Sequence, residues 1–180
     1  QQAIQAALAV TQGKLIIYPT ESVYGLGCDP FNKQACEKIN QLKNRGEKSG
    51  LICLINKLTH LNQLAAPLRS VDYNKIKHSS NRHISWVVPA HKNLPLWLQG
   101  PDQTICVRYS TDPSIKILCD ILDQPIISTC ANRQGESPAI TIEQAKLSFS
   151  SYVDFYLDLP LGKRPSASTI CKLNGTVIRL

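Results

Sequence analysis

The stretch YPTESVYGLGCDPFN, residues 18–32, holds far more turn-forming and hydroxyl residues than a simple hairpin needs. It follows the apolar run Leu15-Ile16-Ile17, which is typical of a buried strand, and a second extended piece is expected over 22–26, after Pro19. One or two glycine, asparagine or proline residues are enough for an ordinary turn. The excess of hydroxyl groups directly after a strand indicates a binding site.

Helical and extended patterns alternate along the rest of the chain. A helix rich in Ala, Gln and Leu is expected over 2–11, with Gly13 at its end. Asn32 is expected to cap a helix that runs to about Lys43, and Pro113 to open another that runs to about 122. Shorter helices are expected over 58–66 and 142–147. Further strands are expected over 14–18, 51–55, 84–88, 104–108, 126–128, 153–157, 168–172 and 176–179. This mixture predicts a layered α/β fold with a mixed sheet, in a single domain over 1–180.

The charge of the chain limits the classes of partner. Lysine and arginine outnumber aspartate and glutamate by 20 to 13, which gives a net charge of +7. A basic surplus favours anionic partners such as nucleotides, RNA or phosphates, although an inert basic surface would give the same count. No apolar run approaches the roughly 18 residues that a membrane helix needs, and no signal-peptide pattern opens the sequence. We therefore expect a cytoplasmic protein with no membrane partner.

Seven cysteines are spread along the sequence without a C-x-x-C pair. Most lie in apolar surroundings, which is typical of buried, reduced thiols in a cytosolic protein. The spacing of cysteine and histidine does not match that of a zinc site, so no metal site is expected.

Polar clusters elsewhere in the chain are the other candidates for chemistry. Lys43 and Arg45 lie in QLKNRGEKSG, residues 41–50, where they are either solvated charges at a helix end or an anion clamp. ISTCANRQGESP, residues 127–138, either caps a turn or lines a ligand site at a strand end. The segment 164–175 is rich in serine and threonine, and Arg108 ends an apolar strand. No P-loop and no Ser-His-Asp arrangement is present, so any reaction would depend on positioning and electrostatics.

Taken in order, these segments resemble the YrdC/TsaC family, the L-threonylcarbamoyladenylate synthases, in its short bacterial form. The matching motifs are YPTESVYGLGCDPFN, LKNRGEKSGLICLI, ICVRYSTDP, IISTCAN and STICKLNGTVIR. The resemblance runs over almost the whole chain, from about residue 3 to residue 179. It implies a YrdC-like twisted mixed sheet flanked by helices, with a basic concave face.

The resemblance also implies a reaction. L-Threonine, bicarbonate and ATP would give L-threonylcarbamoyladenylate and pyrophosphate, and a partner complex would transfer the threonylcarbamoyl group to adenosine 37 of tRNA. ATP would act as a substrate, accompanied by Mg²⁺, although the sequence shows no carboxylate cage for the ion. No prosthetic group is implied.

The resemblance assigns residues to each substrate. For L-threonine these are Thr20, Ser22, Arg108, Ser128 and Ser168. For ATP they are Lys43, Arg45, Ser49, Thr104, Cys130, Asn132, Pro138 and Arg179. Lys43 and Arg45 match the K-x-R signature of the family and would act as the catalytic pair on the phosphates. Arg108 would bind the threonine carboxylate, bidentately if the geometry allows.

Some positions depart from the family pattern. Cys130 stands where the family has the first serine of S-A-N, and a thiol is a weaker hydrogen-bonding group than a hydroxyl. Residues 81–85 read NRHIS where P-G-P followed by an aliphatic residue and Thr is usual. Gly46 replaces the proline after K-x-R, Ala167 precedes Ser168, and the chain stops one residue after Arg179. These changes concern rate and nucleotide affinity more than the fold.

Two other functions fit the same residues. One is a non-catalytic module of the same fold that binds double-stranded RNA or a nucleotide, which a charge of +7 would suit. The other is a carbamoyl-adenylate-forming domain of a hydrogenase maturation factor, which the short length of the chain disfavours. A phosphate-dominated RNA contact weakens steeply with salt, whereas a threonine pocket depends on ligand stereochemistry.

Overall fold

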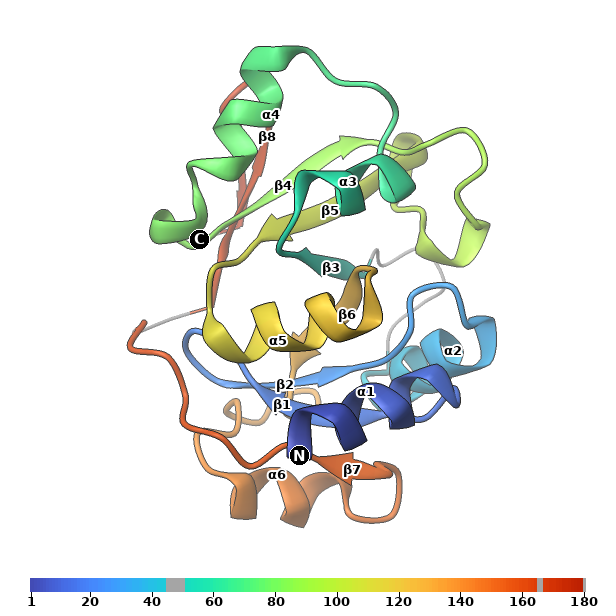
Figure 1. Cartoon of the computed structure of the whole chain (residues 1–180), viewed down its shortest axis with the longest axis vertical. Coiled ribbons are helices and arrows are strands. Elements are labelled where there is room, and N and C mark those ends of the chain that lie inside the picture. Colours follow the sequence, from blue (N-terminus) through green and yellow to red (C-terminus); the bar gives the residue numbers. More distant parts are fainter. Residues whose placement is uncertain (45–50, 165–166, 180) are drawn as a thin grey trace.

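A computed structural model describes residues 1–44, 51–164 and 167–179 as a sheet with helices packed on it (Figure 1). The helices of this part are α1 (Gln2–Thr11), α2 (Lys33–Leu42), α3 (Leu58–Leu64), α4 (Ser70–Lys77), α5 (Pro113–Leu122) and α6 (Ile142–Phe149). The strands are β1 (Ile16–Pro19), β2 (Tyr24–Gly27), β3 (Ile52–Ile55), β4 (Ile84–Pro89), β5 (Thr104–Tyr109), β6 (Ile126–Cys130), β7 (Phe155–Tyr156), β8 (Thr169–Lys172) and β9 (Val177–Arg179). Short 3-10 turns are η1 (Ser80–Arg82), η2 (Leu96–Leu98) and η3 (Pro101–Gln103).

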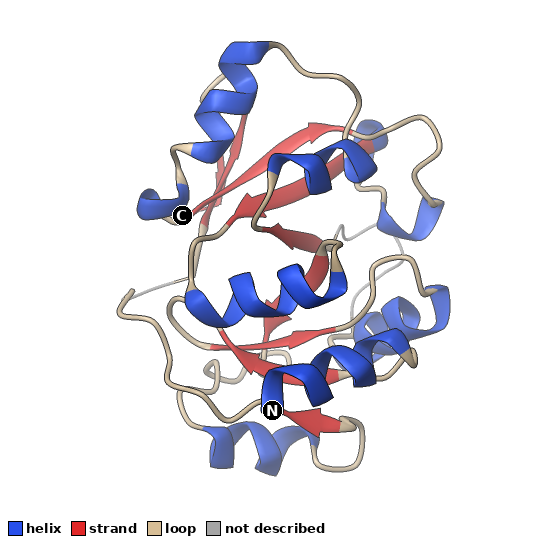
Figure 2. Cartoon of the chain, viewed as in Figure 1, coloured by secondary structure: helices blue, strands red, loops and turns tan. Residues whose placement is uncertain are grey.

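The described strands form one nine-stranded sheet in the order β7-β1-β2-β6-β3-β5-β4-β8-β9. The pairs β1–β7, β3–β5 and β4–β8 are parallel and the other neighbours are antiparallel, so the sheet is mixed. Strand β6 joins the two halves, because it pairs with β2 on one side and with β3 on the other. Figure 2 shows the strands running through the molecule with helices outside them. The predicted mixed α/β fold is therefore confirmed, and the basic concave face stays a prediction.

Two helix starts follow directly from the sequence. The Asn32 side-chain oxygen accepts a hydrogen bond from the Ala35 backbone N–H at 3.0 Å, which caps α2 as predicted. Pro113 is the first residue of α5, and the Asp112 carboxylate before it accepts from the Ser114 N–H at 2.9 Å. These local signals need no tertiary contact, which is why the sequence predicts both starts.

Alternating side chains of the central strands serve two cores. Ile16 and Leu54 pack with helices α1 and α5, whereas Ile17, Cys53 and Ile55 pack on the opposite side. This alternation follows from the two-residue period of a strand. The second core includes residues of α2, α3, α4 and α6, so both faces of the central sheet are covered.

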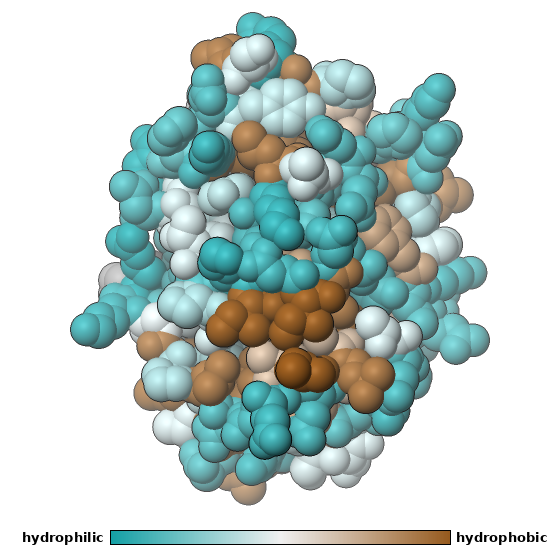
Figure 3. Space-filling view, in the orientation of Figure 1, coloured by the Kyte–Doolittle hydropathy of each residue, from teal (hydrophilic) through white to brown (hydrophobic). Residues whose placement is uncertain are grey.

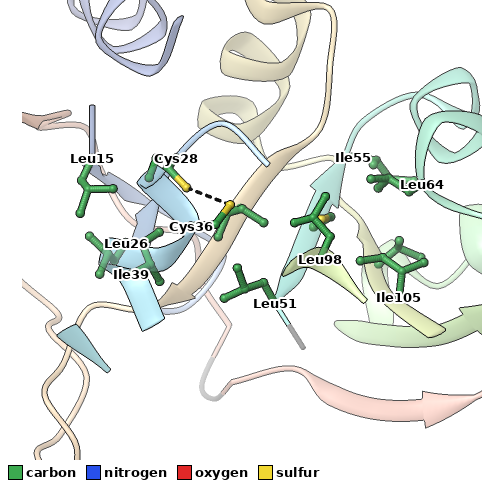
Figure 4. Close-up of a cluster of buried hydrophobic side chains, with 14 of the residues drawn as sticks. Leu15, Leu26, Cys28, Cys36, Ile39, Leu51, Ile55, Leu64, Leu98 and Ile105 are labelled. Carbon is green, nitrogen blue, oxygen red and sulfur yellow. Dashed lines mark hydrogen bonds between the residues drawn. The ribbon is translucent and has the colours of Figure 1, made fainter. Parts of the chain in front are cut away.

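The cysteines confirm the prediction of free, mostly buried thiols. All are unpaired, and only Cys106 and Cys130 are partly exposed. Cys28 and Cys36 place their sulfur atoms 3.9 Å apart inside the core (Figure 4). Burial, together with the neighbouring Cys36 thiol, raises the pKa of Cys28 well above its usual value. This pair therefore packs as small apolar side chains.

One helix is absent from the sequence-based prediction. The structure forms α4 (Ser70–Lys77), a segment with few apolar residues, in which Asp72 and Ile76 are the buried members. The Arg69 guanidinium holds the Asp72 carboxylate at 2.8 Å. Strand β7 is also shorter than the predicted segment 153–157, because only Phe155 and Tyr156 pair with β1. A single buried isoleucine gives no periodic apolar signal, so the sequence does not predict α4.

An apolar patch lies across the face shown in Figure 3, where Figure 1 places α1 and α5 side by side. The exposed apolar residues of these helices are Ile4, Leu8, Ile117 and Ile121. Within the described residues, no helix is both long and apolar enough to cross a membrane.

Candidate functional site

A cavity of about 420 Å³ opens between the two halves of the sheet, beside the loop that joins β1 and β2. Many of the predicted site residues line it. They are Thr20, Ser22, Thr104, Arg108, Ser128, Cys130, Ser168 and Arg179. Residues that are more than 80 positions apart in the sequence thus meet in one cavity, and all of those expected to contact threonine are among them.

Strand β5 supplies one wall of the cavity. Its residues Thr104, Cys106 and Arg108 line the cavity. Ile105 and Val107, which alternate with them, are buried in the core instead. Because side chains of a strand point alternately to its two faces, a single strand provides both a core face and a site face.

The neighbouring strands follow the same rule. In register, Ile52 of β3 lies opposite Ser128 of β6 and opposite Cys106 of β5, and all three line the cavity. At the other wall, Ile170 and Lys172 of β8 line the cavity. Lys172 is a cation at the site that the sequence-based prediction missed.

Gly25 and Gly27, in the stretch 18–32, lie where a larger side chain would meet neighbouring atoms. A Cβ atom on Gly27 would lie 2.4 Å from the Ile127 carbonyl oxygen and 2.6 Å from the ring of Tyr18. Tyr18 is fully buried, and its hydroxyl donates to that same carbonyl at 2.9 Å. Gly25 lines the cavity, where a Cβ would lie 3.2 Å from the Ser128 hydroxyl. Gly27 is therefore required by packing, and Gly25 keeps space beside the site.

Arg108 is the central buried charge of the site. Its Nη2 donates to Glu21 Oε2 at 3.0 Å, and its Nη1 lies 3.1 Å from His83 Nε2. The hydroxyl of Ser110 donates to the other carboxylate oxygen, Glu21 Oε1, at 2.7 Å. Arg108 is 6% exposed, and its buried Nε–H has no partner among the described residues. The guanidinium thus keeps donor capacity that the protein does not use.

The ionisation of Glu21 is fixed by these neighbours. Burial by itself would raise the pKa of Glu21, but the neighbouring His83 ring, whose Nε2 lies 3.6 Å from Oε2, the charge of Arg108 and the Ser110 hydroxyl outweigh it and lower the pKa to about 2. Glu21 is therefore a carboxylate at neutral pH. The prediction of site residues did not include Glu21, His83 or Ser110; Glu21 belongs to the motif that indicated the site, and His83 was noted only as a departure.

Lys43 lies beside the cavity wall rather than on its lining. It is 6% exposed, and its ammonium donates to the Cys130 carbonyl oxygen at 2.9 Å and to Asn132 Oδ1 at 2.7 Å. A further short hydrogen bond, at 2.5 Å, joins it to the Asn132 carbonyl oxygen. Lys43 thus fixes the loop that follows β6.

The remaining predicted residues do not line the first cavity or lie outside the described residues. Arg45 and Ser49 lie outside the described residues. Pro138 lines a second hollow, of about 650 Å³, which shares Val23 and Ala167 with the first cavity. Asn132 donates from its amide to the Glu136 carbonyl oxygen at 2.7 Å. Within residues 1–44, 51–164 and 167–179, no group of three or more His, Cys, Asp or Glu side chains could hold a metal ion.

Comparisons with known proteins agree with this fold. The model of the Sua5/YciO/YrdC family, which is described as "Telomere recombination", matches residues 8–180. A relative from Pseudoalteromonas translucida, named threonylcarbamoyl-AMP synthase, is 40% identical over 189 residues that cover 99% of this chain and 98% of the relative.

Solved structures of other proteins have the same fold. E. coli YciO superposes with a TM-score of 0.86 at 25% identity, covering 99% of this chain and 89% of that chain. P. abyssi Sua5 complexed with L-threonine superposes with a TM-score of 0.84 at 24% identity, covering 96% of this chain and 51% of that chain. Because the family match spans nearly the whole sequence, this chain belongs to the Sua5/YciO/YrdC family.

Proposed function

We propose that this chain is a threonylcarbamoyl-AMP synthase, an enzyme that makes L-threonylcarbamoyladenylate and pyrophosphate from L-threonine, bicarbonate and ATP. One observation carries the proposal: the residues expected to bind threonine and several of those expected to bind ATP line the same cavity. The relative that is 40% identical over 98% of its length bears the same activity in its name. A shared cavity is what a reaction between two bound substrates requires.

Threonine would occupy the part of the cavity near Arg108. The guanidinium would take the carboxylate, since Glu21 and His83 hold it in place and it retains unused donors. Thr20, Ser22, Ser128 and Ser168 would surround the rest of the amino acid. Thr20 and Ser168 are already oriented, because the Thr20 hydroxyl donates to the Val23 carbonyl at 2.7 Å and the Ser168 hydroxyl is hydrogen-bonded to Ser85 at 2.8 Å.

The nucleotide would occupy the side of the cavity formed by Thr104, Cys130 and Arg179. Arg179 donates to the Ser168 carbonyl oxygen at 3.2 Å, which ties this side to the threonine side. Lys172 is a third cation of the lining, after Arg108 and Arg179. Lys43 would act by holding the loop of Cys130 and Asn132 and by contributing its charge nearby. Arg45 would hold the ATP phosphates, and Ser49 would contact the nucleotide.

The reaction would proceed in two balanced steps. First, the amine nitrogen of threonine bonds to the carbon of bicarbonate, water leaves, and N-carboxythreonine forms. Then a carboxylate oxygen of that intermediate attacks the α-phosphorus of ATP, and pyrophosphate leaves. The protein would contribute positioning and neutralisation of charge rather than a covalent nucleophile. We expect ATP to arrive as its magnesium complex, and no described residue is assigned to the ion.

The product has a reactive mixed anhydride, so a partner must consume it. We propose that a tRNA-modifying complex in the cytoplasm takes the threonylcarbamoyl group to adenosine 37 of tRNA. The net charge of +7 is compatible with transient contact with that polyanion.

The chemical identity of the product tests this proposal. The protein would be incubated with L-threonine, ATP and ¹³C-labelled bicarbonate, and the adenylates analysed at once by mass spectrometry. We expect an adenylate that contains one threonine and one labelled carbon. Unlabelled AMP alone, or no new adenylate although ATP is bound, would refute the synthase and favour a nucleotide-binding module.

A further inference from the structure

We propose that His83 is a positioning residue of the threonine site, in which its neutral imidazole holds the Arg108 guanidinium in the orientation that receives the carboxylate. This inference rests on the proposed function, because it assigns the carboxylate of L-threonine to Arg108. His83 does not line the cavity itself, so it acts through Arg108.

The backbone at His83 is unusual, and it creates the contact. His83 follows η1 and has φ 55° and ψ 51°, a left-handed conformation that most residues avoid. A proline, which the family pattern places here, has φ fixed near −65° and cannot adopt this conformation. The His83 carbonyl oxygen accepts from the Thr169 N–H of β8 at 3.2 Å, which anchors the turn. The ring is thereby directed into the protein, where the residue is 7% exposed.

The hydrogen bond between His83 and Arg108 determines the protonation of the imidazole. Arginine can only donate, so Nη1 of Arg108 must donate to Nε2 of His83 across the 3.1 Å that separates them. Nε2 must therefore carry a lone pair, and the ring proton must sit on Nδ1. Only the neutral imidazole can make this contact.

Glu21 makes the arrangement sensitive to a proton on His83. Its Oε2 accepts from Arg108 Nη2 at 3.0 Å and lies 3.6 Å from His83 Nε2. A protonated ring would face the Arg108 N–H with its own N–H, and it would compete with Arg108 for Oε2. Because Glu21 stays ionised well below neutral pH, the carboxylate would remain available for that competition.

The charged groups around the ring come from separate elements. Glu21 approaches from the β1–β2 loop and Arg108 from β5, while β8 contributes the Thr169 backbone N–H. Asp112, which caps α5, lies near enough to Glu21 and Arg108 for their charges to act on its carboxylate. Protonation of His83 would place a second positive charge next to Arg108. The guanidinium, which His83 and Glu21 now hold through Nη1 and Nη2, would then lose its hydrogen bond to His83.

The test compares His83→Leu with His83→Gln by calorimetric titration of L-threonine into the full chain without ATP or bicarbonate. Both replacements carry the same left-handed backbone strain, but only glutamine can accept from Arg108. We expect the Kd for L-threonine to rise about tenfold in His83→Leu, as for the loss of one hydrogen bond to a charged group, and to change little in His83→Gln. His60→Leu, at a buried histidine outside the cavity lining, serves as the control.

Rescue by the conservative variant is a readout that a merely structural role would not give, because His83→Gln restores an acceptor for Arg108 without restoring the imidazole ring. An unchanged Kd in His83→Leu, or an equal rise of the Kd in both variants, would overturn the proposal.

The calorimetric titration also distinguishes failure of the role proposed for His83 from failure of the proposed synthase activity. Wild-type protein that binds L-threonine but makes no adenylate would refute the synthase and still leave His83 tested. Wild-type protein that does not bind L-threonine would overturn the role of His83.

Discussion

Replacing Glu21 by glutamine removes the buried negative charge that faces Arg108 and keeps the size of the side chain. Glu21 is 8% exposed, and its neighbours lower its pKa from 4.5 to about 2. By linkage, that difference corresponds to about 3 kcal/mol of folding free energy at pH 7. We therefore expect Glu21→Gln to lower the free energy of unfolding by about 3 kcal/mol at pH 7.

The pH dependence of this effect has a definite sign. A carboxylate whose pKa is depressed on folding stabilises the protein above its unfolded pKa, and the contribution is lost as the pH falls toward the folded pKa. The difference between wild type and Glu21→Gln should therefore be full at pH 7 and fall to about half by pH 3. Urea unfolding followed by circular dichroism at several pH values measures it.

The exposed pair of Lys33 and Glu37 provides a matched control. These residues are four apart on α2 at 3.6 Å, with half or more of each side chain exposed. Glu37→Gln should change the unfolding free energy by less than about 0.5 kcal/mol at any pH. If Glu21→Gln unfolds like Glu37→Gln at pH 7, or if its deficit does not shrink toward pH 3, the account of a buried charged cluster is wrong.

Other expected outcomes concern packing and the nucleotide side. Gly27→Ala should destabilise the fold by about 2 kcal/mol or more in urea unfolding, because its Cβ would meet the Ile127 carbonyl at 2.4 Å; unchanged stability would contradict this packing. Lys43→Met should raise the KM for ATP more than the KM for L-threonine, because the loop of Asn132 loses its anchor; equal effects on both would count against a loop-holding role. Cys130→Ser should keep or increase turnover, because a hydroxyl hydrogen-bonds better than a thiol; a severe loss would show that the thiol itself is used.

The sequence predicts those parts of the fold that depend on local chemistry. Asn32 and Pro113 mark helix starts through hydrogen bonds and dihedral angles within one turn, and the structure has both helices as predicted. The strand 104–108 is predicted by its apolar residues, and its alternation then places Thr104 and Arg108 on the cavity side. Helix α4 was missed because a single buried isoleucine and an ion pair give no periodic signal.

The family resemblance predicts part of the cavity lining, but not Lys172 and not the partners that hold Arg108 in place. Arg108 and Ser168 follow from motifs, and both line the cavity. The contact of Arg108 with Glu21 and His83 depends on three segments that are far apart in the chain. His83 could not be predicted as a partner, because its position depends on a left-handed turn that the family motif does not contain.

The most direct test of the central claim is pyrophosphate release from ATP and bicarbonate, measured with L-threonine, with D-threonine, with L-serine and with no amino acid. We predict strong release with L-threonine, weak release with D-threonine or L-serine, and none without an amino acid, because the carboxylate, amine and side chain must all fit the cavity beside Arg108. Release that is independent of L-threonine, or no release from folded protein that still binds ATP, would contradict the assignment of this cavity to a threonylcarbamoyl-AMP synthase.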